Sequence, residues 1–435
     1  MSEVKETTVI EGYRNSYNKV LAHIKKYPNT TVKAAMTRLS HIFDINEFVY
    51  TTLSGGKDSG LTSSLAAIVY EMRLKVKARE MAIEEYNELL ETHSTVELME
   101  HDQKPVLMNM DSELMYSMTG EYLYRMYKMY AATYEIGDLS WVDKVNPKNN
   151  PGMYTYDEIA SMSVEEIQDL ISGYGKEALF DGAWCCFPVA WENTASMKES
   201  RYWSWDDTKK KLWTREMPEG QFVWNQDNFY EFPKKMGWPD PEPIITMGQT
   251  DQMLRTRFSR YMKTFKVKPG GTPASCAVLV AIRAAESFDR YTILKQGDYY
   301  TGYYGNQAGV NTYSPVIDMT NEDVYRAFSV FEMNLNEAYD RMYDAGIPLA
   351  KMRIGSLFNT HAGSSASWLA SLDPGTHAKV ISRVDGAEFN NAYGGRVGSS
   401  KHISIPQPKP FFEGRPTKPE QLAIELLNLD FVLAD

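Results

Sequence analysis

The sequence predicts an α/β fold in which a parallel β-sheet is flanked by helices. Apolar runs rich in β-branched and aromatic residues, typical of buried strands, occur at 48–53, 105–110 and 278–282. Stretches with apolar residues at helical spacing follow the first two runs, and this alternation is typical of parallel sheets with right-handed crossovers. Because ligands bind beyond the carboxyl ends of such strands, we expect a binding site there.

The composition excludes several classes of protein. A chain of 435 residues, 43% hydrophobic and 24% charged, is long enough for a large core and for two or three domains. The formal charge of −11 argues against broad, nonspecific nucleic-acid binding. No run approaches eighteen apolar residues, and the N-terminus does not read as a signal peptide, so we expect a cytoplasmic protein without membrane association.

Composition and periodicity divide the chain into three parts. Residues 1–45 form a helical N-terminal segment interrupted at Pro28, and residues 46–350 form the α/β domain. Within that domain we expect an insertion at about 180–245, because seven of the nine tryptophans lie there among prolines and scattered charges. These tryptophans either stack on a base or, as is more usual, fill an irregular small core. Residues 351–435 form a C-terminal α+β extension.

Two further boundaries follow from pattern alone. The apolar period that begins at Leu61 continues to about His93, which predicts one long helix. Residues 314–319 read as an edge strand or strand entry, and Thr320 begins a capping motif for a helix that runs to about Phe331.

The first predicted strand leads into a polar glycine loop, Ser54-Gly55-Gly56-Lys57-Asp58-Ser59, which precedes the first helix of the domain. The N–H groups of a first helical turn lack intrahelical partners and the helix dipole is positive there, so the arrangement favours an anion. The two glycines let a phosphate approach the backbone, the two serines supply hydroxyl donors, and Lys57 adds a positive charge. Asp58 is suited either to capping the helix or to holding Mg²⁺.

The alternative is that the glycines merely form a tight strand-to-helix turn. The loop matches neither the GxxxxGK[ST] nor the GxGxxG spacing of two common phosphate-binding motifs. The order of strand, loop and amphipathic helix nevertheless favours a phosphate site.

Two more groups of polar residues follow predicted strands. Asp111 ends the second strand, where it either accepts a ribose hydroxyl, contacts Mg²⁺ or caps a helix; position alone leaves these open. Arg283 and Arg290 follow the strand at 278–282, and a guanidinium binds oxyanions bidentately. Their alternative role is a salt bridge with Glu286 or Asp289.

Taken together, these motifs resemble the PP-loop ATP pyrophosphatases, the superfamily that includes the phosphoadenosine phosphosulfate (PAPS) reductases. SGGKDS at 54–59, Asp111, AIRAAES…R at 281–290 and YSPVIDMTNEDVY at 313–325 occur in the order seen in that superfamily. Ala281, Met319 and Tyr325 replace its usual Gly, Trp and Trp. The resemblance implies a Rossmann-like adenine nucleotide alpha hydrolase fold. It also implies nucleotide contacts from the 281–290 motif, whose members are Arg283, Glu286, Ser287 and Arg290.

Four other stretches resemble a narrower branch, the DUF3440-type proteins related to the immunoglobulin-binding regulator A protein. They are CCFPVAWENTAS at 185–196, REMPEG at 215–220, AGIPLAKMRIGSLF at 345–358 and SLDPGTHAKVISRVDGAEF at 371–389. The resemblance thus covers residues 35 to 395 and implies a PP-loop nucleotide-binding domain at 46–350 with a DUF3440-type extension at 351–435. It also implies a ParB-like companion protein as a partner.

The cysteines depart from the pattern of PAPS reductases. In the family that this chain resembles, PAPS reductases typically carry a catalytic cysteine on a C-terminal tail. The last five residues here, Phe431-Val432-Leu433-Ala434-Asp435, contain no cysteine. Cys185-Cys186 is similar to half of an iron–sulfur ligand set, but the later pair would fall near 354–358, where no cysteine stands. We therefore expect no iron–sulfur cluster and no reduction of PAPS. Three cysteines also give no disulfide framework, in agreement with a reducing compartment.

The resemblance therefore implies an adenylating enzyme that uses ATP and Mg²⁺. Such enzymes cleave the α–β bond of ATP to AMP and pyrophosphate and pass AMP to an acceptor, in sulfur or nucleic-acid modification. Lys57, Asp58 and Arg283 would be its catalytic residues, with Asp58 as the Mg²⁺ ligand. Some members act on tRNA or on DNA phosphates, which keeps a nucleic-acid substrate open. The alternatives are a nucleotide-sensing regulator without turnover and a PAPS-binding, reductase-like protein.

Overall fold

The structure is a computed structural model, and it describes the greater part of the N-terminal half and selected segments of the remainder. The described residues are 6–46, 48–100, 102, 105–111, 113–132, 163, 182–186, 189–191, 202–205, 207–218, 223–225, 276–288, 290–292, 310–354 and 363–383. In these ranges, no helix combines the length and the apolar character needed to cross a membrane.

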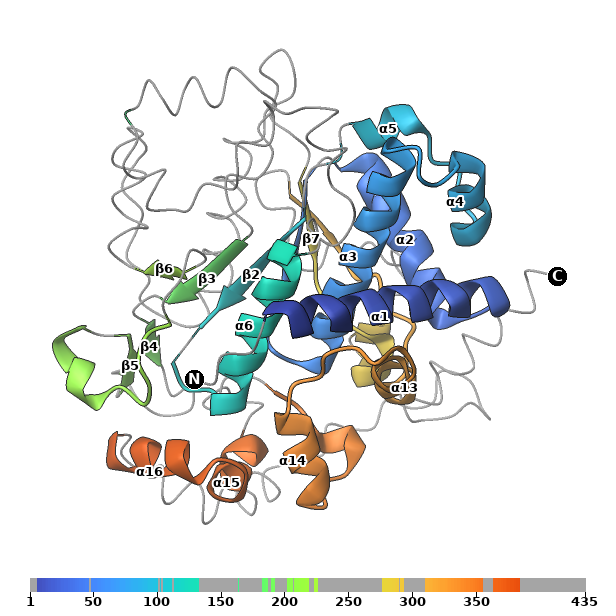
Figure 1. The fold of residues 1–435 in the computed structure, drawn as a ribbon. Helices are drawn as coiled ribbons and strands as arrows, with labels where there is room; N and C mark the ends of the chain where they lie inside the picture. The colour runs from blue at the N-terminus through green and yellow to red at the C-terminus, as the bar shows by residue number, and fades with distance from the viewer. Residues whose placement is uncertain are drawn as a thin grey trace.

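A six-stranded sheet in the order β6-β3-β2-β1-β7-β8 forms the centre of the described fold (Figure 1). Its strands are β1 (Phe48–Thr52), β2 (Val106–Met110), β3 (Gly182–Cys186), β6 (Val223–Asn225), β7 (Cys276–Leu279) and β8 (Val310–Tyr313). Every neighbouring pair runs parallel; Tyr50, for example, lies opposite Val106 on one side and Val278 on the other. The predicted parallel α/β fold is confirmed, and its architecture is consistent with a Rossmann-like fold.

The order of the strands creates a switch point beside β1. From β1 the chain adds β2, β3 and β6 on one side and then returns to add β7 and β8 on the other. The loops that leave β1 and β7 therefore diverge in opposite directions at the carboxyl edge. In doubly wound sheets this is the place where ligands bind.

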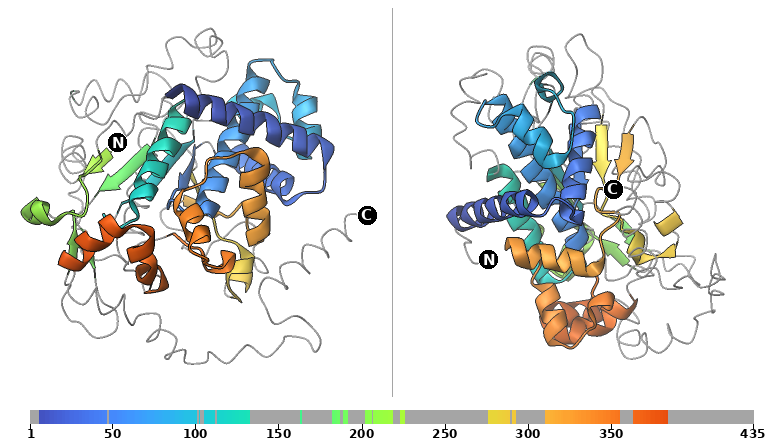
Figure 2. Two further views of the ribbon diagram at one scale, coloured as in Figure 1. Left: turned by 60° about the horizontal axis from the view of Figure 1, so that its bottom comes forward. Right: turned by 90° about the vertical axis from the view of Figure 1, so that its right-hand side faces the viewer.

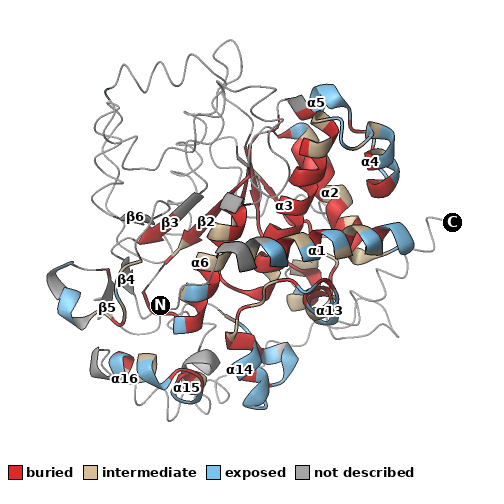
Figure 3. Ribbon diagram, viewed as in Figure 1, coloured by how far each residue is buried: buried red, intermediate tan, exposed pale blue. Residues whose placement is uncertain are grey.

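Helices pack over one face of this sheet, with α3 (Lys57–Lys77) at the centre. Almost every residue of α3 from its first turn to Val76 is buried, as the red ribbon in Figure 3 shows. It packs against α2 (Thr31–Ile45) and α13 (Asn321–Phe331), while α1 (Glu6–Lys26) lies across α13 and α6 (Ser117–Ala132) (Figure 1). The helical N-terminal segment is confirmed, with its break at Pro28 and a new start capped by the side chain of Thr30.

Two predicted boundaries are wrong. The long helix ends at Lys77, and the apolar residues that continue its period belong to a separate helix, α4 (Ile83–Leu90), followed by α5 (Val96–Glu100). The strand expected at 314–319 is instead β8, which ends at Tyr313 before a turn closed by the Ile317 N–H on the Ser314 carbonyl. Pro315 has no N–H for a ladder, so it follows the strand. The cap at Thr320 is confirmed as a reciprocal pair with Asp323.

The interval expected to be an insertion in fact continues the main sheet. Its strands β3 and β6 extend the sheet beyond β2, and only β4 (Val189–Trp191) and β5 (Tyr202–Ser204) form a separate antiparallel pair, followed by a 3-10 turn at Asp207–Leu212. Trp184 and Trp205 are buried, and the Trp184 ring stacks on Tyr127 at 5.9 Å between centroids. These two tryptophans therefore fill the core. The sequence did not reveal the parallel pairing, because strands of five and three residues carry little periodicity.

The C-terminal helices lie at the carboxyl edge of the sheet. They are α14 (Ala338–Asp344), α15 (Gly363–Leu372) and α16 (Pro374–Arg383), with a 3-10 turn at Leu349–Lys351 before α15. In Figures 1 and 2 they gather on the side toward which the strand arrows point. The described part of 351–435 is thus helical.

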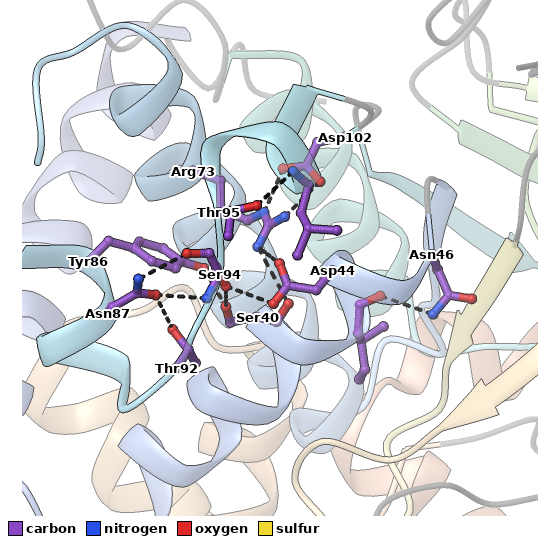
Figure 4. Close-up of polar contacts among 12 residues, drawn as sticks. Ser40, Asp44, Asn46, Arg73, Tyr86, Asn87, Thr92, Ser94, Thr95 and Asp102 are labelled. Carbon is purple, nitrogen blue, oxygen red and sulfur yellow. Dashed lines mark hydrogen bonds and ion pairs between the residues drawn. The ribbon is translucent and has the colours of Figure 1, made fainter. Parts of the chain in front are cut away.

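The buried side chain of Arg73 in α3 binds carboxylates from α2 and from the segment after α5 (Figure 4). The guanidinium of Arg73, which has no exposed surface, donates to Asp102 at 2.5 and 2.9 Å and to Asp44 at 2.7 Å. Asp44 also accepts the Ser94 hydroxyl, so one network joins α2, α3 and the residues before α5. Breaking a buried charge pair leaves the remaining charge without compensation, and this costs more than the pair contributed.

We therefore expect Arg73→Ala to lower the free energy of unfolding by about 3–5 kcal/mol. Urea denaturation of the variant and the wild type measures this difference. The control is Arg326→Ala, which removes an exposed pair with Glu322 and should change stability by less than about 0.5 kcal/mol. Equal losses in the two variants would contradict the central role of the network.

Asp373 joins the C-terminal helices to α6. Its carboxylate accepts the N–H of Ser117, the first residue of α6, at 2.7 Å and the N–H of Thr376 in α16 at 3.2 Å. Burial by itself raises the pKa of Asp373, but these hydrogen bonds outweigh it and hold the pKa below the usual value. The ionised carboxylate therefore stabilises the folded state above the ordinary carboxyl pKa, and this stabilisation is lost as pH falls through the lowered pKa.

We expect Asp373→Asn to cost about 1 kcal/mol near neutral pH and progressively less below about pH 4. Thermal denaturation of both proteins across this pH range measures the difference. Asp340→Asn is the control of opposite sign: partial burial and the neighbouring charges of Asp344 and Glu337 raise the pKa of Asp340, so its neutralisation should stabilise the protein at neutral pH. A pH-independent cost at Asp373 would refute the charge argument.

Candidate functional site

The glycine loop connects β1 to α3 in an unusual backbone shape. Gly55 has φ +80°, and its carbonyl accepts the side-chain amide of Asn336 at 2.9 Å. A Cβ on Gly55 would lie 2.5 Å from the Thr119 methyl group. Gly56 is the N-cap residue of α3 and supplies no side-chain cap. The loop itself thus supplies no capping side chain, and the Lys57 N–H in the first turn is instead bound by the Tyr339 hydroxyl from a distant part of the chain.

The serines of the loop bind each other and the loop backbone. The Ser54 and Ser59 hydroxyls lie 3.1 Å apart, and Ser59 donates to the Gly56 carbonyl at 3.0 Å. Ser54 is exposed and accepts the Gly56 N–H at 3.4 Å. The two hydroxyls therefore shape the loop, and the one on Ser54 also faces solvent.

Charged side chains from the segments that follow β1 and β7 meet at the loop. Asp58 pairs through one carboxylate oxygen with the Lys57 ammonium at 3.0 Å and through the other with the Arg283 Nε at 2.6 Å. Lys57 is 4% exposed and Arg283 1% exposed, so both cations are buried. We call these three residues the loop charge cluster. It contains two cations and one carboxylate, and it lies where the chain diverges from β1 and β7.

Two tyrosines surround Lys57. Its ammonium lies 5.8 Å from the ring centroids of Tyr325 and Tyr339, and the Tyr339 hydroxyl accepts the Lys57 backbone N–H at 2.9 Å. Burial lowers the pKa of Lys57, Arg283 and Arg353 lower it further, and Asp58 acts in the opposite direction. A buried ammonium next to aromatic faces is stabilised by an added anion more strongly than a solvated one is.

Arg283 is held rigidly by the chain that follows β8. Its guanidinium donates to the Met319 carbonyl at 3.2 Å and to the Asn321 side-chain oxygen at 2.6 Å. These contacts hold the guanidinium at the start of helix α13 and next to Asp58. Spacing along the sequence could not reveal them, because 36 and 38 residues separate the partners.

Three other candidates form a local unit beside the cluster. Arg290 pairs with the Glu286 carboxylate, which also accepts the Arg283 backbone N–H at 3.2 Å. Ser287 accepts the Arg290 N–H at 3.3 Å. The structure thus gives Arg290 the salt bridge that was its alternative role, whereas Arg283 reaches the loop. Asp318 of the 313–325 motif pairs bidentately with Arg38 of α2, both contacts 2.7 Å long, and so fastens α2.

Asp111 lies at the end of β2 but not in the loop charge cluster. Its buried carboxylate pairs with Arg215 and accepts the Trp184 indole N–H at 2.9 Å and the Glu113 N–H at 2.8 Å. Glu113 in turn accepts the N–H groups of Trp205 and Thr214 at 3.1 and 2.7 Å. These contacts make Asp111 the centre of a network that holds residues 205–215 to the sheet edge.

The adjacent cysteines belong to the core. Cys185 and Cys186 are buried, and burial together with the Asp111 carboxylate raises the pKa of both thiols. A thiol in such surroundings is a poor nucleophile and a poor metal ligand. Both side chains therefore pack in the core beside Asp111.

A magnesium ion at this loop would have to be bound mainly by phosphates. Mg²⁺ commonly takes one or two protein carboxylates and completes its shell with waters and phosphate oxygens. Asp58 supplies one carboxylate at the loop, although both oxygens face cations here. Within the described part of the chain, no group of three or more His, Cys, Asp or Glu side chains could hold a metal by itself.

Sequence reasoning missed four residues of the site. Tyr325, Tyr339, Asn321 and Asn336 contact Lys57, Arg283 or the loop carbonyl but lie far from them in sequence. Only Tyr325 left a signal, as an aromatic residue at a motif position that is otherwise Trp.

Similarity to known proteins bears on the C-terminal part. Residues 346–411 match the family described as "Domain of unknown function (DUF3440)". Over 242 aligned residues the chain is 23% identical to the "Uncharacterized protein YbdN" of Escherichia coli (strain K12). The aligned segment covers 54% of this chain and 53% of that protein. The chain therefore spans about half the length of this curated relative. No solved structure matches it. The DUF3440 part of the resemblance is supported, and neither match names a PP-loop or PAPS reductase family.

The loop geometry gives a direct test of its shape. Gly55→Ala should destabilise the protein by at least about 1–2 kcal/mol, because a left-handed conformation is unfavourable for alanine and the Cβ meets the Thr119 methyl group. Urea denaturation measures the loss. Thr119→Ser, which removes that methyl group, should recover part of it in the double variant.

Gly120→Ala is the matched control, because a Cβ there meets nothing within 4 Å and the residue lies inside α6. It should be neutral or stabilise by about 0.4–1 kcal/mol. A Gly55→Ala protein as stable as this control would show that the loop does not hold the described backbone.

Proposed function

We propose that this chain binds ATP at the loop charge cluster and transfers AMP to an acceptor. One observation carries the proposal. Two buried cations, one from the first residue of α3 and one from the segment after β7, converge on one carboxylate at the start of α3, where Gly56 supplies no side-chain cap. Their positive charge exceeds what Asp58 neutralises, and a phosphate group is the anion that suits this place in a doubly wound sheet.

Each residue of the site would have a distinct role in this transfer. The first-turn N–H groups of α3 and the Lys57 ammonium would hold the β- and γ-phosphates, and Arg283 would hold the α-phosphate through its guanidinium. An acceptor heteroatom attacks the α-phosphorus and forms a new bond to it. The bond from that phosphorus to the α–β bridging oxygen breaks, and its electron pair leaves with pyrophosphate. The proton of the acceptor passes to water.

Preorganised positive charge would be the main catalytic contribution. Negative charge grows on the leaving pyrophosphate, and fixed cations in a buried site stabilise it without reorganising. Mg²⁺, bound with ATP and held in part by Asp58, would neutralise further phosphate charge. Arg283 needs no rearrangement, because Met319 and Asn321 already fix its guanidinium.

Two properties favour ATP over a sulfonucleotide as the ligand. The Lys-Asp pair in the loop resembles that of the ATP-cleaving members of the PP-loop superfamily. The two cysteines beside the sheet edge are buried and have raised thiol pKa values, so they would not serve a reductase. The nucleic-acid or sulfur acceptor and a ParB-like companion protein stay within the proposal as partners that the resemblance implies.

Calorimetric titration with ATP, AMP and PAPS, each with and without Mg²⁺, tests the proposal. We expect ATP with Mg²⁺ to bind most tightly and to release pyrophosphate when an acceptor is supplied. Tighter binding of PAPS would overturn the assignment of ATP. Binding of ATP without release of pyrophosphate, across a panel of thiol, tRNA and DNA acceptors, would instead favour a nucleotide-sensing regulator.

Lys57→Gln should weaken ATP binding by about tenfold or more, because a hydrogen bond to a charged group contributes about 1.5–3 kcal/mol. Calorimetry measures the change. Lys77→Gln is the matched control, since Lys77 lies on the same helix, about 30 Å from Lys57 at 1.5 Å per residue. Equal affinities of the two variants would refute the role of Lys57.

A further inference from the structure

Residues 352–354 lie against the glycine loop. The Met352 sulfur accepts the Tyr325 hydroxyl at 3.6 Å, and Tyr325 is one of the two tyrosines beside Lys57. The Ile354 carbonyl oxygen lies 3.8 Å from the position that a Cβ on Gly56 would occupy. The chain thus touches the site just before and just after Arg353. We call residues 352–354 the loop strap.

Arg353 itself differs from the other cations of the site. Lys57 and Arg283 are buried, whereas Arg353 is exposed. Its charge nevertheless acts on Lys57: after burial, which is the largest cause, Arg283 and Arg353 both lower the pKa of Lys57. Arg353 is therefore near enough for its charge to be felt at the loop.

The charges around the loop are not balanced. Lys57, Arg283 and Arg353 are positive, and Asp58 is the carboxylate that pairs with the first two. The nearby Glu286 is matched by its own partner, Arg290. Among the residues that the structure describes, the charges assigned to this loop, with Arg353 included, are thus three cations and one carboxylate. A ligand with several negative charges in a row would fit this arrangement better than one with a single phosphate.

We propose that Arg353 is a third cation of the nucleotide site, one that binds the outer phosphates and so selects a polyphosphate chain over a nucleoside monophosphate. This rests on the proposed function, which places the α-phosphate at Arg283 and the outer phosphates toward Lys57. Because Arg353 lies at the exposed side of the loop, it contacts the phosphates that extend furthest from the sheet. A guanidinium suits that task, since it binds phosphate oxygens bidentately.

In this proposal the C-terminal part of the chain contributes a side chain to the phosphate site. The match to DUF3440 begins at residue 346, so the loop strap belongs to that region. The helix α14 before the strap carries Tyr339, whose hydroxyl binds the Lys57 backbone N–H. The C-terminal region thus completes the phosphate site rather than forming a separate unit.

Titration of the full-length chain with pyrophosphate and with AMP tests the inference. Arg353→Gln should weaken pyrophosphate binding about tenfold, in line with the loss of one charged hydrogen bond, and change AMP binding less than about twofold. Arg353→Lys should recover part of the pyrophosphate affinity, because it keeps the charge but not the bidentate fork. The temperature of unfolding should stay at the wild-type value in both variants.

Lys351→Gln is the matched control, since Lys351 is an exposed cation two residues before Arg353 in the same segment. It should leave both ligands within about twofold of the wild type. An Arg353→Gln protein that binds pyrophosphate like the Lys351→Gln protein would overturn the inference but leave the proposed function intact. Equal losses for AMP and pyrophosphate would overturn the selectivity. A wild-type chain that binds neither ATP nor pyrophosphate would overturn both proposals.

Discussion

The ion pairs of Asp58 are the interaction on which the rest of the site depends. This carboxylate holds Lys57 from its own helix and Arg283 from the segment after β7, so it joins the two sides of the switch point. Both cations are buried, and a buried cation without an anion is unstable. The loop, the start of α3 and the Arg283 segment are therefore bound to one another by charge as well as by packing.

Much of the surrounding structure serves to hold this arrangement in place. Asn321 and the Met319 carbonyl orient Arg283, Tyr339 binds the backbone of Lys57, and Asn336 binds the Gly55 carbonyl. These partners lie in the segments around α13 and α14. The Arg73 network, near the other end of α3, joins that helix to α2. A site supported in this way can present positive charge to a ligand without first reorganising, which is the main requirement for binding phosphates.

A second polar centre lies at the same edge of the sheet. Asp111 follows β2 as the loop follows β1, yet Arg215, Trp184 and Glu113 already engage its carboxylate. Arg290 similarly pairs with Glu286, four residues before it. The contacts described for these side chains are with other residues of the chain, and their nucleotide-binding role stays a prediction. Lys57, Asp58 and Arg283 differ, because their charges meet around one point and do not cancel.

Four features could be predicted from the sequence: the α/β class, the strand–loop–helix unit at 48–77, the helical N-terminal segment and the cap at Thr320. Each of them depends on local periodicity or on capping residues that are close in sequence. Only the tertiary structure decided that β3 and β6 join the main sheet, that Arg283 rather than Arg290 reaches the loop, and that Asp111 is already engaged. The reason is physical. These outcomes depend on strand order and on pairs separated by tens to hundreds of residues, such as Asn336 with Gly55, and no local pattern encodes which distant partner a side chain meets.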